Sequence, residues 1–343
     1  MGFELHDKIA GSLIGVAVGD VLGAPHEGFV LQSPQDADYT ADGVEDWQRH
    51  VMRFMDMLFR VHDGVVRDIH FPPLFWRYGE ETDDTTQTVA IAQALVAGNG
   101  FNGSIIEQRL LGWHKSGKAR GEGGTTALAL NLIEAGKATW QNAGAMAKET
   151  TPTVEDGRSL HAVAANGSMM RTAPLALVYR SRIGDEPNEL MRLARDLSAI
   201  THDFEECHVA CQIVCTMIAM SLWGHDKQEI RSSVTYDPKF SSLLTQALQH
   251  IQGKTGHGGG ALTTLGIAWR SFFDTDSFED AVVAAVNPGG WRTDTDSYGG
   301  VTGAIAGAYY GAGSIPERWT APLWPYTKAD MLNLADQILM IQL

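Results

Sequence analysis

The chain contains little cysteine. Only three of its 343 residues are cysteines, and they recur every four residues as Cys207, Cys211 and Cys215. This spacing lines side chains along one stripe of a helix, where they are poorly placed to form disulfides with one another. We therefore expect a cytoplasmic protein in which the three thiols act as small apolar core groups. The alternative is that these three cysteines ligate a metal ion.

Positive charge is also scarce. Lys and Arg number 26 against 41 Asp and Glu, which gives a formal net charge of −15. Such a surface offers no general attraction to nucleic acid or to an anionic membrane, so we expect neither as a partner. The apolar run over residues 9–24 is interrupted by Asp20 and is too short to span a bilayer. We expect no membrane span and no signal peptide.

Series of alternating polar and apolar residues, tandem repeats and linker-like stretches are absent from the sequence. Most long segments show helical periodicity instead, and a composition that is 44% hydrophobic can fill a large core. We predict an all-α fold that forms one domain over residues 1–343, with an insertion at 29–81 over or beside the functional site. The predicted helices span residues 7–22, 83–98, 103–117, 125–136, 142–149, 170–180, 188–200, 204–223, 240–251, 259–272, 277–286, 297–311 and 328–341.

Two of these helices carry glycine at every fourth position. The two rows are Gly11, Gly15, Gly19 and Gly23, and Gly299, Gly303, Gly307 and Gly311. Because each interior glycine costs about 1 kcal/mol relative to alanine in a helix, the rows need a packing reason. We predict close backbone approach, with both helices near the centre of the fold. Membrane helices also use such spacing, but length and polarity argue against a membrane helix here.

Acidic clusters begin two predicted helices, as Thr82-Asp83-Asp84-Thr85 and Asp294-Thr295-Asp296-Ser297. In the first, a threonine N-cap and two aspartates in the first turn are explained equally by helix capping. In the second, Asp294 and Asp296 alternate in a predicted extended lead-in, so both carboxylates would face the same way. Oxygen ligands without His or Cys suit Mg²⁺, Mn²⁺ or Ca²⁺. We interpret the clusters as two halves of one metal site, although the second would also suit a solvated turn.

Two further acidic residues lie near the end of the first helix. Glu27 follows a Pro-containing turn, where a free carboxylate can act as a general acid or base, although an isolated loop glutamate is more often a surface residue. Asp20 lies inside the helix, so we expect it to make buried structural hydrogen bonds.

Glycine-rich turns precede two more helices, at residues 121–126 and 166–171. Each could present backbone N–H groups to a phosphate, or be a plain turn, and neither has the spacing of a P-loop or a Rossmann motif. His202 begins the cysteine-bearing helix and is either a ligand contact or a polar residue at a helix start.

Taken in order, these motifs resemble the ADP-ribosylglycohydrolase family over nearly the whole chain. The motifs are residues 19–28, 82–85, 121–126, 166–174, 201–202 and 294–297, the last followed by a glycine-rich helix. The resemblance implies an all-α enzyme that holds two Mg²⁺ ions, or Mn²⁺ in some members. It also implies cleavage of the bond between ADP-ribose and a modified side chain or related acceptor.

The resemblance assigns roles to particular residues. The implied ligands of the metal pair are Thr82, Asp83, Asp84, Asp294, Asp296 and Ser297. Catalysis would rest on Glu27 with the ligands Asp84 and Asp296. The residues implied to hold the diphosphate and riboses are Gly123, Gly124, Asn166, Gly167, Ser168, Met169 and His202. Glu122 is a further candidate for substrate binding or acid–base chemistry, because it stands one position from a catalytic Asp of some members.

Three departures from the family pattern bear on substrate choice more than on metal binding. Residues 291–293 separate a Gly-Gly pair from Asp294, two glutamates precede Thr82, and Asp203 follows His202. The leading hypothesis is thus a Mg²⁺-dependent hydrolase acting on an ADP-ribosylated protein or a small ADP-ribosyl compound. The alternatives are a hydrolase of another ribosyl glycoside, and a protein that binds and neutralises an ADP-ribosylating toxin through residues 29–81.

Overall fold

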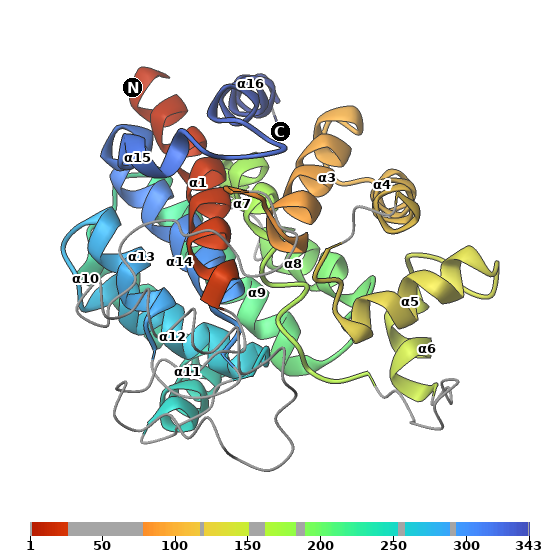
Figure 1. Ribbon diagram of the computed structural model, residues 1–343. Helices are drawn as coiled ribbons and strands as arrows, with labels where there is room; N and C mark the ends of the chain where they lie inside the picture. The colour runs from red at the N-terminus through yellow and green to blue at the C-terminus, as the bar shows by residue number, and fades with distance from the viewer. Residues whose placement is uncertain are drawn as a thin grey trace, which may run out of the picture.

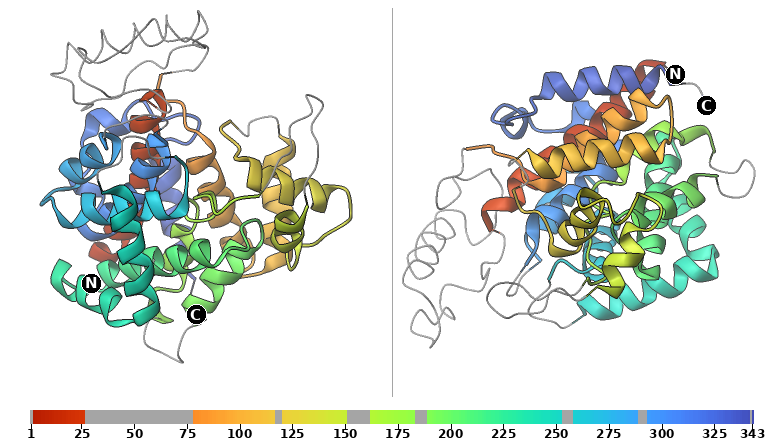
Figure 2. Two further views of the ribbon diagram at one scale, coloured as in Figure 1. Left: turned by 90° about the horizontal axis from the view of Figure 1, so that it is seen from below. Right: turned by 90° about the vertical axis from the view of Figure 1, so that its right-hand side faces the viewer.

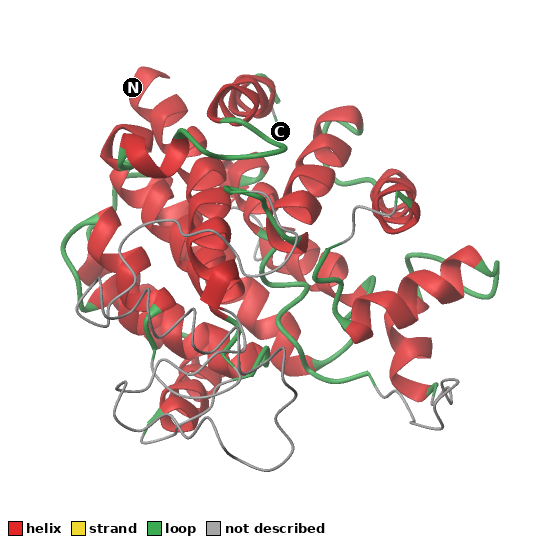
Figure 3. Ribbon diagram, viewed as in Figure 1, coloured by secondary structure: helices red, strands yellow, loops and turns green. Residues whose placement is uncertain are grey.

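The computed structural model describes residues 2–26, 78–116, 120–150, 162–182, 189–252, 258–288, 293–341 and 343. Within these ranges the chain is helical, and its only β-type pairings are isolated bridges between Glu80 and Trp324 and between Ala165 and Gly260 (Figure 3). The predicted all-α fold is confirmed. None of the helices in these ranges is both long enough and apolar enough to cross a membrane.

The centre of the fold is an antiparallel pair of helices, α1 (Gly2–Gly23) and α14 (Thr295–Tyr310), as Figure 1 shows. A Cβ atom built on Gly303 would lie 2.0 Å from the carbonyl oxygen of Gly15, and one on Gly19 would lie 2.0 Å from that of Gly299. Only glycine permits this approach, so the predicted packing of the two glycine rows is confirmed. The pairing also brings the end of α1 to the start of α14.

The other helices pack around this pair. They are α3 (Asp83–Ala97), α4 (Gly103–Lys115), α5 (Gly124–Glu134), α6 (Ala143–Glu149), α7 (Ala173–Val178), α8 (Glu189–Ala199), α9 (Glu205–Leu222), α10 (Lys227–Tyr236), α11 (Pro238–Ile251), α12 (Ala261–Phe273), α13 (Phe278–Val286), α15 (Glu317–Thr320) and α16 (Lys328–Leu339). Helices α3 to α6 lie on one side of the central pair and α10 to α13 on the other (Figures 1 and 2).

Three predicted boundaries were wrong. The first helix begins at Gly2, and α7 begins only at Ala173, because residues 166–172 form turns beside the functional site. Helix α14 begins at Thr295, so Asp296 lies in its first turn and not in an extended lead-in; Asp294 alone precedes it. Helices α10 and α15 were not predicted: α10 buries only two apolar residues, and α15 is a single turn.

The cysteine stripe lies on α9, as predicted. All three thiols are free and buried, and burial raises the pKa of each, so they are apolar core groups. In the described part of the chain no three His, Cys, Asp or Glu side chains form a preformed metal-binding group, either on this stripe or at the acidic helix starts. Residues 27–77, with most of the predicted insertion and Glu27, lie outside the described ranges.

Candidate active site

The two acidic clusters meet where α3 and α14 begin. Thr82 is the N-cap of α3, and its side-chain oxygen accepts a hydrogen bond from the backbone N–H of Asp84 at 3.3 Å. Asp83 and Asp84 occupy the first turn and are only 5% and 1% exposed. The hydroxyl of Ser297, in the first turn of α14, donates to Asp84 Oδ2 at 3.2 Å. This contact joins two clusters that are 213 residues apart in the chain.

The carboxylate of Asp20, in α1, holds the start of α3 in place through hydrogen bonds. Its carboxylate accepts hydrogen bonds from the backbone N–H groups of Thr82 and Thr85, at 3.0 and 3.1 Å, and from the Thr85 hydroxyl at 2.5 Å. Burial raises the pKa of Asp20 to about 6, although these hydrogen bonds act to lower it. The predicted structural role of Asp20 is confirmed, since three donors from one helix start converge on its carboxylate.

Negative charge is concentrated at this junction. Burial raises the pKa of Asp84 well above its usual value, and the neighbouring charges of Asp83, Asp20 and Asp294 raise it further. Asp84 Oδ1 is buried and accepts no hydrogen bond from any residue in the described ranges. Asp294 Oδ2 accepts one from Asn166 Nδ2 at 2.5 Å. A partnerless buried carboxylate oxygen is costly, and a hard cation held by carboxylates and hydroxyls would relieve that cost.

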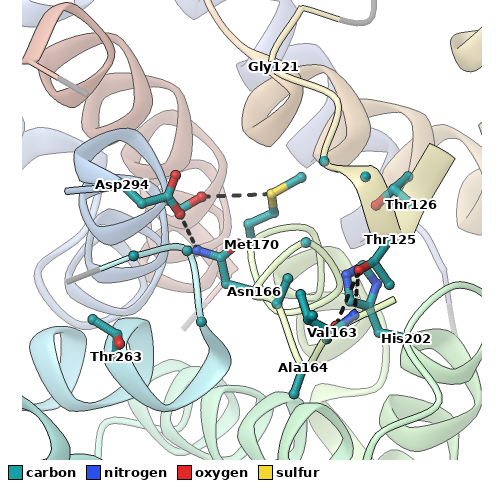
Figure 4. A pocket seen from close by; sticks show the side chains of 18 of the residues that line it. Gly121, Thr125, Thr126, Val163, Ala164, Asn166, Met170, His202, Thr263 and Asp294 are labelled. Carbon is teal, nitrogen blue, oxygen red and sulfur yellow. Dashed lines mark hydrogen bonds between the residues drawn. The ribbon is translucent and has the colours of Figure 1, made fainter. Parts of the chain in front are cut away.

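A cavity of about 610 Å³ opens in front of the cluster (Figure 4). Asp83, Asp84, Asp294, Asp296 and Ser297 form part of its wall. The remainder comes from residues 121, 123–126, 163–167, 170, 258–260 and 263 with His202 and His250. The volume lies in the range of small-molecule and cofactor sites. Carboxylate and hydroxyl side chains that could hold a metal therefore lie beside glycine-rich loops.

Glycines bring these loops close to the acidic groups. Gly121 has a φ of +86°, and a Cβ built there would lie 2.5 Å from Asp83 Oδ1. A Cβ on Gly259 would lie 2.9 Å from Asp294 Oδ2, and one on Gly167 would lie 3.0 Å from His202 Cε1. Side chains at these positions would narrow the cavity, so the loops use glycine to bring backbone to its wall.

The predicted substrate-binding residues divide into two groups. Those that line the cavity are Gly123, Gly124, Asn166, Gly167 and His202. Ser168, Met169 and Glu122 are not part of that lining. Ser168 accepts a hydrogen bond from Ser198, and Met169 is buried in the core. The structure therefore places these two side chains behind the wall, and Met170, which was not predicted, lines it instead.

Glu122 is directed to a histidine outside the cavity lining. One of its carboxylate oxygens lies 2.6 Å from His114 Nδ1 of α4. Burial raises the pKa of Glu122, while the hydrogen bond from His114 acts to lower it. In this position the side chain ties the loop to α4, so the structure offers no support for Glu122 as the acid or base.

A chain of buried hydrogen bonds was missed by sequence reasoning. Gln87 Nε2 donates to Asp83 Oδ2 at 2.9 Å, and Gln87 Oε1 accepts from Arg171 Nη1. Arg171 Nη2 donates to Thr201 Oγ1 at 2.6 Å, and that oxygen lies 2.7 Å from His202 Nδ1. The chain thus links the acidic cluster to the opposite wall. Its only local signal was Gln87, four residues after Asp83 on the same helix.

Arg171 and His202, two ionisable groups of this chain, each keep one charge state near neutral pH. Burial lowers the pKa of Arg171 to about 10, so its guanidinium stays charged. Burial, together with the charge of Arg171, lowers the pKa of His202 to about 3, so its imidazole is neutral. His202 therefore contributes a hydrogen-bonding group and no charge to the cavity.

Comparison with known proteins gives the family of the chain. A model of the ADP-ribosylglycohydrolase family matches residues 2–342. ADP-ribosylarginine hydrolase Tri1 of Serratia proteamaculans is 25% identical over 98% of this chain and 80% of its own length. The ADP-ribosyl-[dinitrogen reductase] glycohydrolase of Rhodospirillum rubrum is 25% identical over 99% of this chain and 98% of its own.

The fold has a solved counterpart as well. A structure of an ADP-ribosylglycohydrolase-related protein complex superposes with a TM-score of 0.68 at 27% identity, covering 99% of this chain and 100% of that chain. The match of the family model to nearly every residue and the shared all-α fold lead to one conclusion: the chain is a hydrolase and belongs to the ADP-ribosylglycohydrolase family.

Proposed function

We propose that this protein is a Mg²⁺-dependent hydrolase that removes ADP-ribose from a modified protein side chain by cleaving an N- or O-glycosidic bond. The observation that carries the proposal is the meeting of two acidic helix starts, joined by the Ser297–Asp84 hydrogen bond, at a cavity walled by glycine-rich loops. Relatives named for hydrolysis of ADP-ribosylarginine and of ADP-ribosyl-dinitrogen reductase support a modified protein as substrate.

The donor set of the cluster fits hard divalent cations, Mg²⁺ or Mn²⁺. The residues that would hold a metal pair are Thr82, Asp83, Asp84, Asp294, Asp296 and Ser297. Supporting this assignment, Asp84 Oδ1 is buried without a hydrogen-bond partner among the described residues. Burial, and then repulsion from neighbouring aspartates, raises the pKa of the Asp84 carboxyl group. When bound, the cations would supply positive charge that orients the ribose hydroxyls and stabilises charge as the glycosidic bond breaks.

The protein's own groups would orient the rest of the substrate. Helix α5 begins at Gly124 in the cavity wall, so its first N–H groups suit an anionic diphosphate. Thr201 accepts a hydrogen bond from Arg171, which favours donation of its own hydroxyl hydrogen to His202 Nδ1. The neutral imidazole then carries its hydrogen on Nε2, where it can donate to a substrate oxygen. Glu27 remains our predicted general acid or base.

A panel of defined linkages tests the proposal most directly. ADP-ribosyl-arginine, ADP-ribosyl-serine and free ADP-ribose derivatives are offered with Mg²⁺, with Mn²⁺ and with excess chelator, and released ADP-ribose is measured. We expect release from at least one protein linkage that the chelator abolishes and Mg²⁺ restores. Asp83→Ala/Asp296→Ala should match the chelated enzyme, whereas Asp274→Ala/Asp336→Ala removes the same number of charges at two exposed carboxylates outside the cavity lining and serves as the matched control.

Three outcomes would redirect the assignment. Release that persists after chelation or in the double variant would remove the metal-dependent mechanism. Cleavage confined to free derivatives, without strong inhibition by ADP-ribose, would favour a hydrolase of another ribosyl glycoside. Protection of cells from an ADP-ribosylating toxin that survives loss of the metal ligands would favour binding of the toxin over hydrolysis.

A further inference from the structure

Two carboxamide side chains direct their NH₂ groups at the acidic cluster, one at each half. Gln87 Nε2 donates to Asp83 Oδ2 at 2.9 Å, and Asn166 Nδ2 donates to Asp294 Oδ2 at 2.5 Å. Figure 4 shows the second of these contacts. The two amides belong to different elements, α3 and the turns before α7, yet each makes the same kind of contact with an aspartate.

The partners of Gln87 fix which way its amide faces. Its Oε1 accepts a hydrogen bond from Arg171 Nη1. A guanidinium group only donates, so the amide oxygen must face Arg171 and the NH₂ group must face Asp83. Both Gln87 and Arg171 are fully buried. Gln87 therefore offers its donor to Asp83 in one orientation only.

Both the backbone and the side chain of Asn166 are anchored. Its N–H donates to the carbonyl oxygen of Gly259 at 2.9 Å, and its carbonyl oxygen accepts from the N–H of Met169 at 2.7 Å. Besides Asp294, its Nδ2 donates to Thr264 Oγ1 at 2.8 Å. An NH₂ group has two hydrogens, so these two acceptors use both. Asn166 therefore keeps no side-chain N–H for a substrate, although it lines the cavity.

The two contacts orient carboxylates without cancelling their charge. Each occupies one oxygen of an aspartate, and the donor is a neutral amide, so the negative charge remains for a hard cation. Asp84, next to Asp83 in the chain, keeps a buried oxygen that accepts no hydrogen bond from the described residues. Partners that hydrogen-bond to metal ligands commonly change metal affinity by about 10- to 100-fold.

We propose that Gln87 and Asn166 are positioning residues that orient Asp83 and Asp294 for metal binding and act through these aspartates. For Asn166, this role replaces the substrate contact that the family resemblance implies. The proposal rests on the metal site put forward under the proposed function.

Titration calorimetry of the full chain with Mn²⁺ tests the proposal. The variants Gln87→Met and Asn166→Ala each remove the amide donor from one aspartate. We expect each variant to bind Mn²⁺ at least about tenfold more weakly than the wild type. The matched controls are Gln93→Met, at a half-buried residue of the same helix, and Asn333→Ala, at an exposed residue of α16. Both controls lie outside the cavity lining and should bind Mn²⁺ as the wild type does.

A second titration separates positioning from contact with the substrate. With Mn²⁺ at saturation, ADP-ribose should bind Asn166→Ala as tightly as it binds the wild type, because excess metal offsets the weaker metal site. Weaker ADP-ribose binding by Asn166→Ala together with unchanged Mn²⁺ affinity would make Asn166 a substrate contact and overturn the proposal.

Stability measurements separate positioning from a structural role. A structural role alone would lower the free energy of unfolding in metal-free urea titrations and leave the Mn²⁺ affinity of the folded variants unchanged, which would overturn the proposal. Asn166→Ala truncates a side chain at the cavity wall and keeps the test valid if Gln87→Met does not fold. No Mn²⁺ binding by the wild type would overturn the proposed metal site as well, whereas wild-type affinity in both variants would overturn the positioning roles alone.

Discussion

The substitution Gly303→Ala tests the packing of the central helix pair. The added Cβ would lie 2.0 Å from the carbonyl oxygen of Gly15 and 2.6 Å from its carbonyl carbon, where ordinary van der Waals contact begins near 3.4 Å. Both groups are backbone atoms of long, buried helices, so no side chain can rotate away. The helices must separate by more than an ångström along this direction, or one of them must bend.

Two effects of opposite sign set the change in the free energy of unfolding. Replacing glycine by alanine in a helix stabilises by about 1 kcal/mol through backbone propensity. Overpacking a well-packed core costs about 1–3 kcal/mol, and this contact falls at or beyond the upper end because neither partner can move alone. We therefore expect a net destabilisation of about 2 kcal/mol or more.

Gly112 provides the matched control. It also lies inside a helix, α4, but a Cβ built there meets no atom within 4 Å. Gly112→Ala should stabilise by about 0.5–1 kcal/mol, because only the propensity effect remains. Urea denaturation followed by circular dichroism, without metal or ADP-ribose, measures both variants. If Gly303→Ala proved as stable as Gly112→Ala, close backbone contact between α1 and α14 would not be what requires the glycine rows.

Three further predictions concern the buried groups. Because burial raises the pKa of every thiol on α9, a thiol reagent at about pH 8 should modify none of them in the native protein and all three after unfolding; rapid modification of the folded chain would contradict this. The folded-state pKa of His202 is about 3 and its ordinary value about 6.5, so the unfolded chain binds a proton that the native state excludes, and stability falls as the pH drops below 6.5. When the pH is lowered from about 8 to about 5, the free energy of unfolding of His202→Gln should therefore rise by about 2 kcal/mol relative to that of the wild type, as measured by paired urea titrations. A difference in the free energy of unfolding that is the same at both pH values would refute the lowered pKa of His202. Arg171→Lys keeps the charge but cannot reach both Gln87 and Thr201, so kcat/KM for ADP-ribose release should fall at least about tenfold while the protein remains folded; wild-type kcat/KM would show that the chain of hydrogen bonds does not position the site.

The helices were predictable from the sequence where they bury a broad apolar face. The periodicity of α9 and the spacing of the glycine rows are local properties, and both predicted the observed packing. Helix α10 was missed because it is polar, with only Ile230 and Val234 buried. Its capping box, formed by Asp226 and Glu229, was the signal that could have identified it.

The functional site was predictable in part for the same reason. Thr82 and the aspartates after it form a helix start, and a helix start depends on neighbouring residues alone. The placement of Asp296 was wrong because the sequence does not show where the extended chain before α14 ends. Glu122 and Ser168 looked equivalent to the glycines beside them, and only the packing of α4 and α8 draws their side chains away from the cavity.

The sequence by itself determined the helical class, the two helix starts that carry carboxylates and the glycine rows, because each depends on residues a few positions apart. Only the tertiary structure decided that Ser297 meets Asp84, that Arg171 connects two walls of one cavity, and that Asn166 meets Asp294. These contacts join positions far apart in the chain, and the one between Ser297 and Asp84 depends on the close approach of α1 and α14. The glycines that permit this approach therefore also bring the two halves of the acidic cluster together.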